Sequence, residues 1–212
     1  WDYFKLDEKT SRADKMKINQ LKKLLNGFDE NLHFEYDLKK KNWFNIGGKS
    51  KVFFKADNLN QLINFLKTIN NQERMFVLGA GSNILVTDGL FDGIVIKLGK
   101  NFSNITLHSE DIIIAGSAVL DKSLSYFALK NNLSGFEFLS CIPGTIGGGI
   151  SMNAGCFGKE FKDILVSIQV TDKFGKVTTI PSKEIKFEYR KNNIPEDYIF
   201  LSASFKGIKS NQ

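Results

Sequence analysis

The sequence predicts an α+β fold, on the strength of three observations. Three segments carry Leu, Ile and Phe at the spacing of a helix with one apolar face. Several shorter runs are rich in Val, Ile and Phe, which is typical of strands. These helices and strands do not alternate regularly along the chain, as they would in a doubly wound parallel sheet.

The first part of the chain contains two of the helices, with a strand between them. Leu and Ile recur at helical spacing from about residue 12 to Asn26, and Gly27 suits the C-terminal cap. Lys49–Ala56 is a strand-like run. A second helix is expected over about Asn58–Asn70, with Asn58 or the Asp before it as the N-terminal cap, because both side chains accept hydrogen bonds from a first turn.

The rest of the chain is predicted to be mainly strands. A third helix is expected over Asp121–Asn131, ahead of a long glycine-rich stretch. Asp172–Gly175 has the composition of a hairpin turn between two strands. The strands expected here are Met75–Leu78, Ile84–Val86, Gly93–Leu98, Asp111–Ala115, Ile164–Thr171, Lys176–Ile180 and Tyr198–Phe205.

Charge and composition narrow the class of partner. The net charge is +6, but the basic residues are nearly all lysines scattered among acids, and the densest run is Lys39–Lys41. Proteins that read nucleic-acid grooves concentrate Arg and Lys on one face, so we expect no nucleic-acid partner. No apolar run approaches the roughly 20 residues that span a bilayer, and no signal-peptide pattern is present. We therefore expect a cytoplasmic protein without a membrane partner.

Neither the start of the chain nor its cysteines and histidines point to further chemistry. The first residue is Trp, and Met16 is a candidate initiator, in which case residues 1–15 would be a non-native leader. Two cysteines and two histidines, far apart in sequence, do not form a metal-ligand pattern or a disulfide framework. We expect no metal site.

The first of three glycine-rich segments is the Gly-Ala-Gly-Ser-Asn run of residues 79–83, where a strand enters a tight turn. Consecutive N–H groups in such a turn form a nest for phosphate oxygens. A Rossmann fingerprint would need a third glycine where this chain has Ile84, and a helix where a strand is expected. An anion-binding turn and a tight turn without a ligand both remain open.

The second segment, Asn45–Ser50, contains a Gly-Lys-Ser sequence. A P-loop requires a glycine five positions before the Gly-Lys pair, and that position is Trp43. Nucleotide hydrolysis by a P-loop is therefore rejected. Gly47 and Gly48 are expected to turn the chain into the following strand, with contact to a ligand left open.

The third segment, Gly135–Gly158, carries five glycines between residues 144 and 155. In an ordinary helix each would cost about 1 kcal/mol relative to alanine. Flexible loops are usually polar, whereas this one also carries many Phe, Ile, Leu and Met side chains. A buried segment whose backbone lies against a planar ring or a pyrophosphate fits this composition better than a flexible loop.

Together these segments resemble the UDP-N-acetylenolpyruvoylglucosamine reductase (UDP-N-acetylmuramate dehydrogenase) family. The resemblance rests on Gly-Ala-Gly-Ser-Asn, on Gly-Phe-Glu-Phe…Ile-Pro-Gly-Thr-Ile-Gly-Gly…Met-Asn-Ala-Gly and on Phe187-Glu188-Tyr189-Arg190, in this order, over roughly residues 42–206. Two departures are Cys141, where the family usually has glycine, and Trp43, where threonine is commoner.

The resemblance implies a two-lobed FAD-binding fold of the vanillyl-alcohol-oxidase (PCMH) type with the cofactor between the lobes. It implies an N-terminal helical arm over residues 1–41, one lobe over 42–105 and the other over 106–208. The residues implied to hold the FAD pyrophosphate are Gly79, Ala80, Gly81, Ser82 and Asn83; those implied to pack against the cofactor from the other lobe are Pro143, Gly144, Thr145, Gly148 and Gly149, with Asn153, Ala154 and Gly155 near them.

The same resemblance implies that Arg190 is the catalytic residue of an NADPH-using flavoenzyme of peptidoglycan precursor synthesis. The family passes hydride from NADPH through FAD to the enolpyruvyl group of a UDP-sugar. A guanidinium suits the substrate carboxylate, on which charge grows in the transition state. The family's proton-donor serine and second stabilising glutamate lie in a C-terminal substrate domain that would begin near residue 210, so this chain is expected to lack that domain and to be weakly active or inactive by itself. Another FAD oxidoreductase of the same fold and a non-catalytic flavin-binding module are the alternatives.

Overall fold

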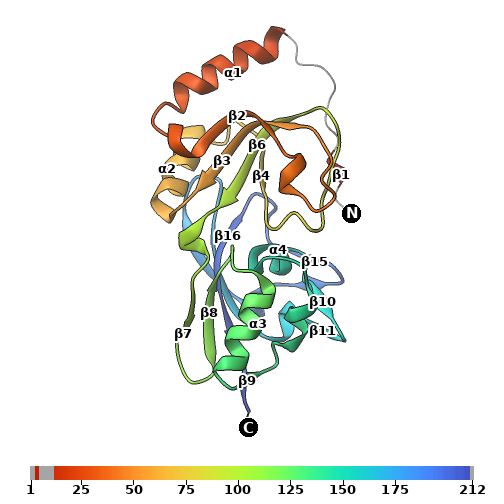
Figure 1. The fold of residues 1–212 in the computed structure, drawn as a ribbon. Helices are drawn as coiled ribbons and strands as arrows, with labels where there is room; N and C mark the ends of the chain where they lie inside the picture. The colour runs from red at the N-terminus through yellow and green to blue at the C-terminus, as the bar shows by residue number, and fades with distance from the viewer. Residues whose placement is uncertain (1–2, 5–11, 211–212) are drawn as a thin grey trace. The chain divides into compact units, whose positions relative to one another are not determined.

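The computed structural model describes residues 3–4 and 12–210, with side chains from residue 18 onward. Two compact units make up the chain. Unit 1 comprises Trp1–Leu98 with Lys173–Gly175, and unit 2 comprises Gly99–Asp172 with Lys176–Gln212. Figure 1 shows both units as sheets accompanied by helices. Among the described residues, no helix is long and apolar enough to cross a membrane.

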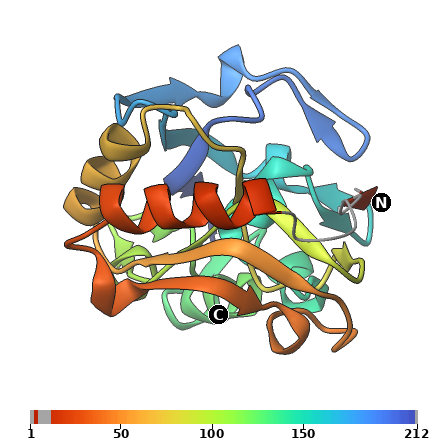
Figure 2. The same ribbon diagram turned by 90° about the horizontal axis from the view of Figure 1, so that it is seen from above.

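Unit 1 is built on a four-stranded mixed sheet. The strand order is β2 (Leu32–Asp37), β3 (Lys49–Ala56), β6 (Leu90–Leu98) and β4 (Met75–Val77). β2 runs antiparallel to β3, beside which it is seen in Figure 2, and β3, β6 and β4 are mutually parallel. The connection from β3 to β4 passes through helix α2 (Leu59–Ile69), as parallel strands require a crossover.

Helix α2 starts and ends where its polar residues predict. The side-chain oxygen of Asn58 accepts a hydrogen bond from the backbone N–H of Gln61 at 3.0 Å, and Asn70 ends the helix in the left-handed conformation. The apolar face of the helix is fully buried, and the ring of Phe65 stacks on Phe54 of β3 with centroids 3.9 Å apart. α2 therefore covers one face of the sheet.

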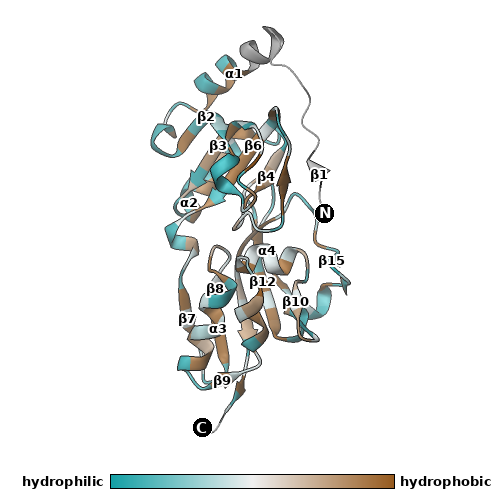
Figure 3. Cartoon of the chain, turned by 45° about the vertical axis from the view of Figure 1, so that its right-hand side comes forward, coloured by the Kyte–Doolittle hydropathy of each residue, from teal (hydrophilic) through white to brown (hydrophobic). Residues whose placement is uncertain are grey.

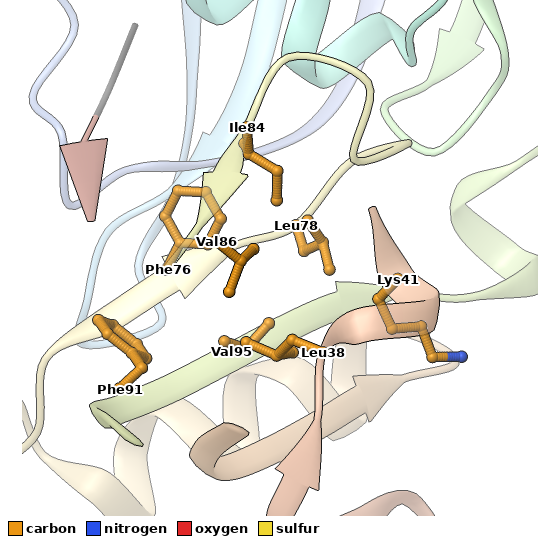
Figure 4. Close-up of a pocket in the computed structure, with 8 residues that line it drawn as sticks. All are labelled: Leu38, Lys41, Phe76, Leu78, Ile84, Val86, Phe91 and Val95. Atoms are coloured by element: carbon orange, nitrogen blue, oxygen red, sulfur yellow. The ribbon is translucent and has the colours of Figure 1, made fainter. Parts of the chain in front are cut away.

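The opposite face of this sheet carries a second apolar cluster, because neighbouring residues of a strand point to opposite faces. Phe53 of β3 and two residues of β6, Phe91 and Val95, belong to it. The segments that follow β2 and β4 add Leu38, Leu78 and Val86. An apolar pocket opens among these side chains (Figure 4). Its lining residues are Leu38, Lys41, Phe76, Leu78, Ile84, Val86, Phe91 and Val95.

The N-terminal part of unit 1 adds helix α1 (Arg12–Leu24) and two short strands. Ile18, Leu21 and Leu25 are buried, and Gly27 follows with φ +106°, a conformation that favours glycine. β1 (Tyr3–Phe4) pairs in parallel with β5 (Leu85–Val86).

Unit 2 is built on a five-stranded sheet in which every neighbouring pair is antiparallel. The strand order is β13 (Val177–Pro181), β12 (Leu165–Thr171), β16 (Ile199–Lys206), β8 (Ile112–Gly116) and β7 (Ile105–Leu107). Helices α3 (Asp121–Lys130) and α4 (Ile146–Ser151) contribute buried residues to its core, with Phe136, Phe161 and Phe205 fully or almost fully buried. Figure 3 shows the apolar colouring that runs along these strands and those of unit 1.

Short paired strands and single turns of 3₁₀-helix complete both units. The strand pairs are β9 (Leu133–Ser134) with β17 (Ile208–Lys209), β10 (Gly155–Cys156) with β11 (Lys159–Glu160), and β14 (Phe187–Glu188) with β15 (Lys191–Asn192). The 3₁₀ turns are Asp29–Asn31, Lys39–Lys41, Lys100–Phe102, Glu137–Cys141, Phe161–Asp163 and Ser182–Glu184.

The structure confirms the α+β class, the three helices and the strands that the sequence predicts, with boundaries shifted by at most three residues. Several elements differ from expectation. The sequence does not predict β2, β7 or the short paired strands β1, β9, β10, β11, β14, β15 and β17. Gly147–Gly149, expected to be costly in a helix, form half of the short helix α4. The lobe boundaries at residues 42, 105 and 208 stay predictions.

Candidate functional site

The turn over residues 79–83 lies in unit 1, between β4 and β5. Gly81 has φ +72°, and a Cβ at this position would lie 2.2 Å from the carbonyl oxygen of Lys41. The Gly81 carbonyl accepts a hydrogen bond from the Trp43 N–H at 3.0 Å, and the Gly79 carbonyl accepts one from the Lys97 ammonium. Two carbonyls of the turn are therefore fixed by neighbouring segments, and only glycine fits at its centre.

The backbone N–H groups of this turn are available to a ligand. Within the described part of the chain, the N–H groups of Gly79, Ala80, Gly81 and Ser82 donate no hydrogen bond. Consecutive free N–H groups beside a positive-φ residue form a concave site for an anion. The anion-binding alternative left open by the sequence is thus favoured by the geometry.

The two glycines of the second segment are explained by packing within unit 1. A Cβ at Gly47 would lie 2.5 Å from the Val86 side chain, and one at Gly48 would lie 1.9 Å from the Gly89 carbonyl oxygen. The Gly48 N–H donates to Thr87 at 2.9 Å. Close contact with β5 and the residues that follow it accounts for both glycines without a ligand.

The third segment lies in unit 2, where the 3₁₀ turn Glu137–Cys141 is followed by a single bridge between Thr145 and Leu120 and then by α4. Its N–H groups at Ile146 and Gly147 donate to the carbonyls of Val119 and Ser117, both at 2.9 Å. Gly144 accepts from the Asp121 N–H at 3.2 Å. Pro143–Thr145 is thereby held beside the start of α3.

Several buried polar atoms lie without hydrogen-bond partners where Pro143–Thr145 meets the residues that lead into α3. Asp121 and Ser117 are almost fully buried, at 0% and 4% exposure, and neither the Asp121 carboxyl oxygens nor the Ser117 Oγ makes a hydrogen bond to a described residue. A Cβ on Gly144 would lie 2.6 Å from one Asp121 carboxyl oxygen. Burial raises the pKa of Asp121 to about 7, since no described group offsets the cost of its charge. A buried carboxyl without donors is unusual and marks this stretch as a candidate site.

Gly148 and Gly149 differ in what surrounds them. A Cβ at Gly149 would lie 2.2 Å from the ring of the buried Phe161, so this glycine is required by packing. Gly148 is exposed, and a Cβ there would meet only the Thr145 hydroxyl at 3.5 Å. Of the two, Gly148 is the one that presents its backbone outward.

Asn153 serves the fold of the third segment. Its side chain is fully buried and donates to Glu160 at 3.1 Å and to the Glu188 carbonyl at 3.3 Å, while accepting from the Lys162 N–H at 3.2 Å. Ala154 is buried, and Gly155 pairs with Glu160 in β10 and β11. These contacts occupy the Asn153 amide within the protein.

Arg190 lies in the turn between β14 and β15, with φ +57°. Its guanidinium donates to the Gly155 carbonyl at 3.4 Å and lies 5.6 Å from the ring centre of Tyr189, which is 84% exposed. The pKa of Glu160 is lowered by a hydrogen bond from Lys162, with smaller contributions from Asn153 and Arg190. Unit 2 therefore brings Arg190 to the end of the third segment and leaves it exposed.

Comparison with known proteins places these features in a family. Residues 50–181 match a protein family described as FAD binding domain. The chain belongs to this FAD-binding family. Over 197 residues it is 61% identical to the UDP-N-acetylenolpyruvoylglucosamine reductase of Pelagibacter ubique, and over 179 residues 48% identical to that of Rickettsia bellii. These alignments cover 93% and 84% of the chain but 65% and 59% of the relatives, so the chain spans less than two thirds of their length.

Solved structures agree with this assignment. The crystal structure of UDP-N-acetylenolpyruvylglucosamine reductase from Thermus caldophilus matches with a TM-score of 0.73 at 27% identity, covering 85% of this chain and 62% of that one. p-Cresol methylhydroxylase matches with a TM-score of 0.59 at 13% identity, covering 97% of this chain and 45% of that one, which shows a shared fold. The expected FAD-binding fold of the vanillyl-alcohol-oxidase type is confirmed.

Sequence reasoning on this FAD-binding chain missed three residues that contact the predicted segments: Lys97, Ser117 and Asp121. Lys97 does carry a signal, since it interrupts the apolar run of β6. Ser117 and Asp121 precede and begin an ordinary helix, and nothing nearby in sequence marks them as buried. Among the described residues, no cluster of three or more His, Cys, Asp or Glu is placed to hold a metal.

Proposed function

We propose that this chain binds FAD, with the pyrophosphate on the free N–H groups of the turn over residues 79–83. The single observation that carries the proposal is that run of four N–H groups, fixed around a glycine that no other residue could replace. The family match supports FAD as the ligand. FAD would supply hydride transfer at its flavin ring.

The third segment is proposed as the second contact for the cofactor. Pro143 and Gly148 are exposed and Gly144 is half-buried, whereas Thr145 is buried between them. The orphaned carboxyl of Asp121 lies against Gly144, and Ser117 lies against the neighbouring Gly147. Gly149, Asn153, Ala154 and Gly155 support this stretch through their packing and hydrogen bonds. Exposed glycine backbone beside unpartnered polar groups fits a planar ring with polar edges.

We propose further that the chain forms the FAD-binding part of an NADPH-dependent enzyme that reduces UDP-N-acetylglucosamine enolpyruvate to UDP-N-acetylmuramate. Its relatives carry the name of this reductase. Arg190 would bind the substrate carboxylate, because its charge is permanent and its guanidinium is exposed. No serine or glutamate of this chain is assigned the family's proton-donor or second stabilising role, so we expect this polypeptide by itself to turn over weakly or not at all.

FAD binding is tested by incubating the purified chain with FAD, desalting it and recording the flavin absorption. We expect flavin to be retained, and to be lost in Ser82→Asp, which places a negative charge in the turn without changing a glycine. Asn71→Asp is the matched control, since it adds the same charge at an exposed position of unit 1. Equal flavin retention by both variants would count against the assignment of the turn.

The reaction is tested on a protein extended to the full length of the relatives. NADPH oxidation should depend on the enolpyruvyl UDP-sugar, and Arg190→Met should lower kcat/KM by about 10²–10³, as for loss of a group that stabilises developing charge. Oxygen consumption with an alcohol, without a preference for NADPH, would instead indicate an oxidase of the same fold.

A further inference from the structure

The two buried or half-buried lysines of the unit 1 sheet differ in their partners. Lys51 on β3 is 3% exposed at its side chain and forms ion pairs with Glu73 at 2.5 Å and Asp92 at 2.6 Å. Although burial works against its charge, these two carboxylates raise the pKa of Lys51. A buried lysine paired in this way is explained by the fold alone.

Lys97 on β6 has no such explanation. It is half-buried, and within residues 3–4 and 12–210 its hydrogen-bond partner is the Gly79 carbonyl, with no carboxylate beside it. Burial lowers the pKa of Lys97, and the neighbouring charge of Lys41 lowers it further. Two cations therefore approach each other without a counter-charge, which is unfavourable unless an anion joins them.

The side chain of Lys97 lies on the face of the sheet that carries the turn. Alternation along β6 puts Val95 and Lys97 on the face of the sheet that carries the second apolar cluster. Ile94 and Ile96 point to the opposite face, where both are fully buried. Leu78, which leads into the turn, donates its N–H to the Ile96 carbonyl at 2.8 Å. The turn therefore begins where Lys97 can reach its first carbonyl.

Lys41 reaches the same turn from the segment after β2. Its carbonyl oxygen is the atom that a Cβ on Gly81 would meet, and its ammonium lies 5.6 Å and 5.9 Å from the ring centres of Tyr36 and Phe53. In Figure 4 the Lys41 ammonium points away from the apolar side chains of the pocket. Its charge is thus held outside the apolar cluster, and it lies near enough to Lys97 to lower the pKa of that lysine.

We propose that Lys97 is a positioning residue for the cofactor pyrophosphate, and that Lys41 joins it in supplying positive charge. By binding the Gly79 carbonyl, Lys97 turns that oxygen away from the anion and leaves the N–H groups of Gly79 to Ser82 facing it. Its ammonium also adds a partly desolvated charge, where electrostatic interactions are stronger than in water. This inference rests on the proposed binding of FAD to the turn.

The test is the dissociation constant for FAD, measured by flavin fluorescence over a range of salt concentrations. We expect Lys97→Met to weaken FAD binding by about tenfold to a hundredfold, the usual effect of losing one hydrogen bond to a charged group. Salt screens a half-buried charge less than an exposed one but still weakens its attraction for an anion, so the variant should also depend somewhat less on salt than the wild type. Lys97→Arg should restore much of the affinity, and Lys97→Gln is the second variant should Lys97→Met fail to fold.

Lys55→Met is the matched control. Lys55 pairs with Lys97 in the register of β3 and β6, but its side chain is 50% exposed and paired with Asp57 at 2.9 Å. Unchanged FAD affinity in Lys97→Met, or weaker binding with an unchanged salt dependence, would overturn the role of Lys97 while leaving FAD binding intact. A wild-type chain that does not bind FAD would overturn the proposed function as well.

Discussion

Asp121 provides a test of the structure that needs no cofactor. Its carboxyl is fully buried without a hydrogen-bond partner among the described residues, and burial raises its pKa from 3.8 to about 7. Between these values the unfolded chain has released the proton while the folded chain keeps it. The folded protein binds more protons, so its stability falls as pH rises from 3.8 and levels off above 7.

The size of the effect follows from the two pKa values. A difference of about three pH units corresponds to a total of about 4 kcal/mol, of which about 3 kcal/mol falls between pH 5 and 8. Asp121→Asn keeps the shape of the side chain and removes the titration. We therefore expect the variant to gain about 3 kcal/mol relative to wild type over this pH range, as an order of magnitude.

The assay is urea unfolding of both proteins at a series of pH values, followed by circular dichroism. The difference in unfolding free energy between the variant and the wild type is the quantity of interest, because other titrating groups cancel in it. A difference that stays constant from pH 5 to 8 would show that the Asp121 carboxyl is solvated or has a partner in the folded protein, and would refute the reasoning.

Three further changes test packing, charge and capping. Gly149→Ala should lower the free energy of unfolding by about 1–3 kcal/mol, because the added Cβ would meet the buried Phe161 ring. Gly148→Ala in the same helix should leave it unchanged or raise it by up to about 1 kcal/mol, and thermal unfolding compares the two variants. Glu73→Gln should cost about 1–3 kcal/mol by weakening the pairing of buried Lys51, while Glu110→Gln, in the exposed pair with Lys209, should change urea stability by under about 0.5 kcal/mol. Asn58→Ala should cost about 1 kcal/mol through loss of the α2 cap, and equal stability of variant and wild type would contradict the cap.

Local patterns were sufficient to predict the elements whose stability is local. α2 is bounded by an Asn cap and a left-handed Asn, with an apolar face between them, and all of these can be read from the sequence. β2 was missed although His33, Glu35 and Asp37 alternate with its apolar residues, which is a strand pattern. The polar residues around it resemble a loop, and pairing with β3 is what shows the strand. The short helix α4 was missed because its glycines argue against a helix, and only the Phe161 ring beside Gly149 shows why they are there.

Some residues of the candidate site can likewise be recognised from local sequence, and others cannot. Glycine-rich segments are visible in sequence because several unusual residues stand together, and the structure shows that their backbone positions require glycine at Gly81 and Gly149. Lys97 and Asp121 are single residues whose surroundings come from segments 18 and 23 positions away, at Gly79 and Gly144. Their burial depends on how those segments fold back, which composition and periodicity do not record.

Buried ionisable groups in this chain fall into two kinds. Those that have a counter-charge are explained by the fold, and those without one indicate a ligand site. Lys51, with two carboxylates, is satisfied by the protein and needs nothing else. Lys97 in unit 1 and Asp121 in unit 2 are the ones whose charge the described residues leave uncompensated, and each contacts a glycine-rich segment that the sequence already marks. Because leaving a group in this state is costly, its contact with a glycine of such a segment is better explained by a ligand than by stability. The two variants proposed for these residues separate the possibilities: Lys97→Met should affect binding, and Asp121→Asn should change the pH dependence of unfolding.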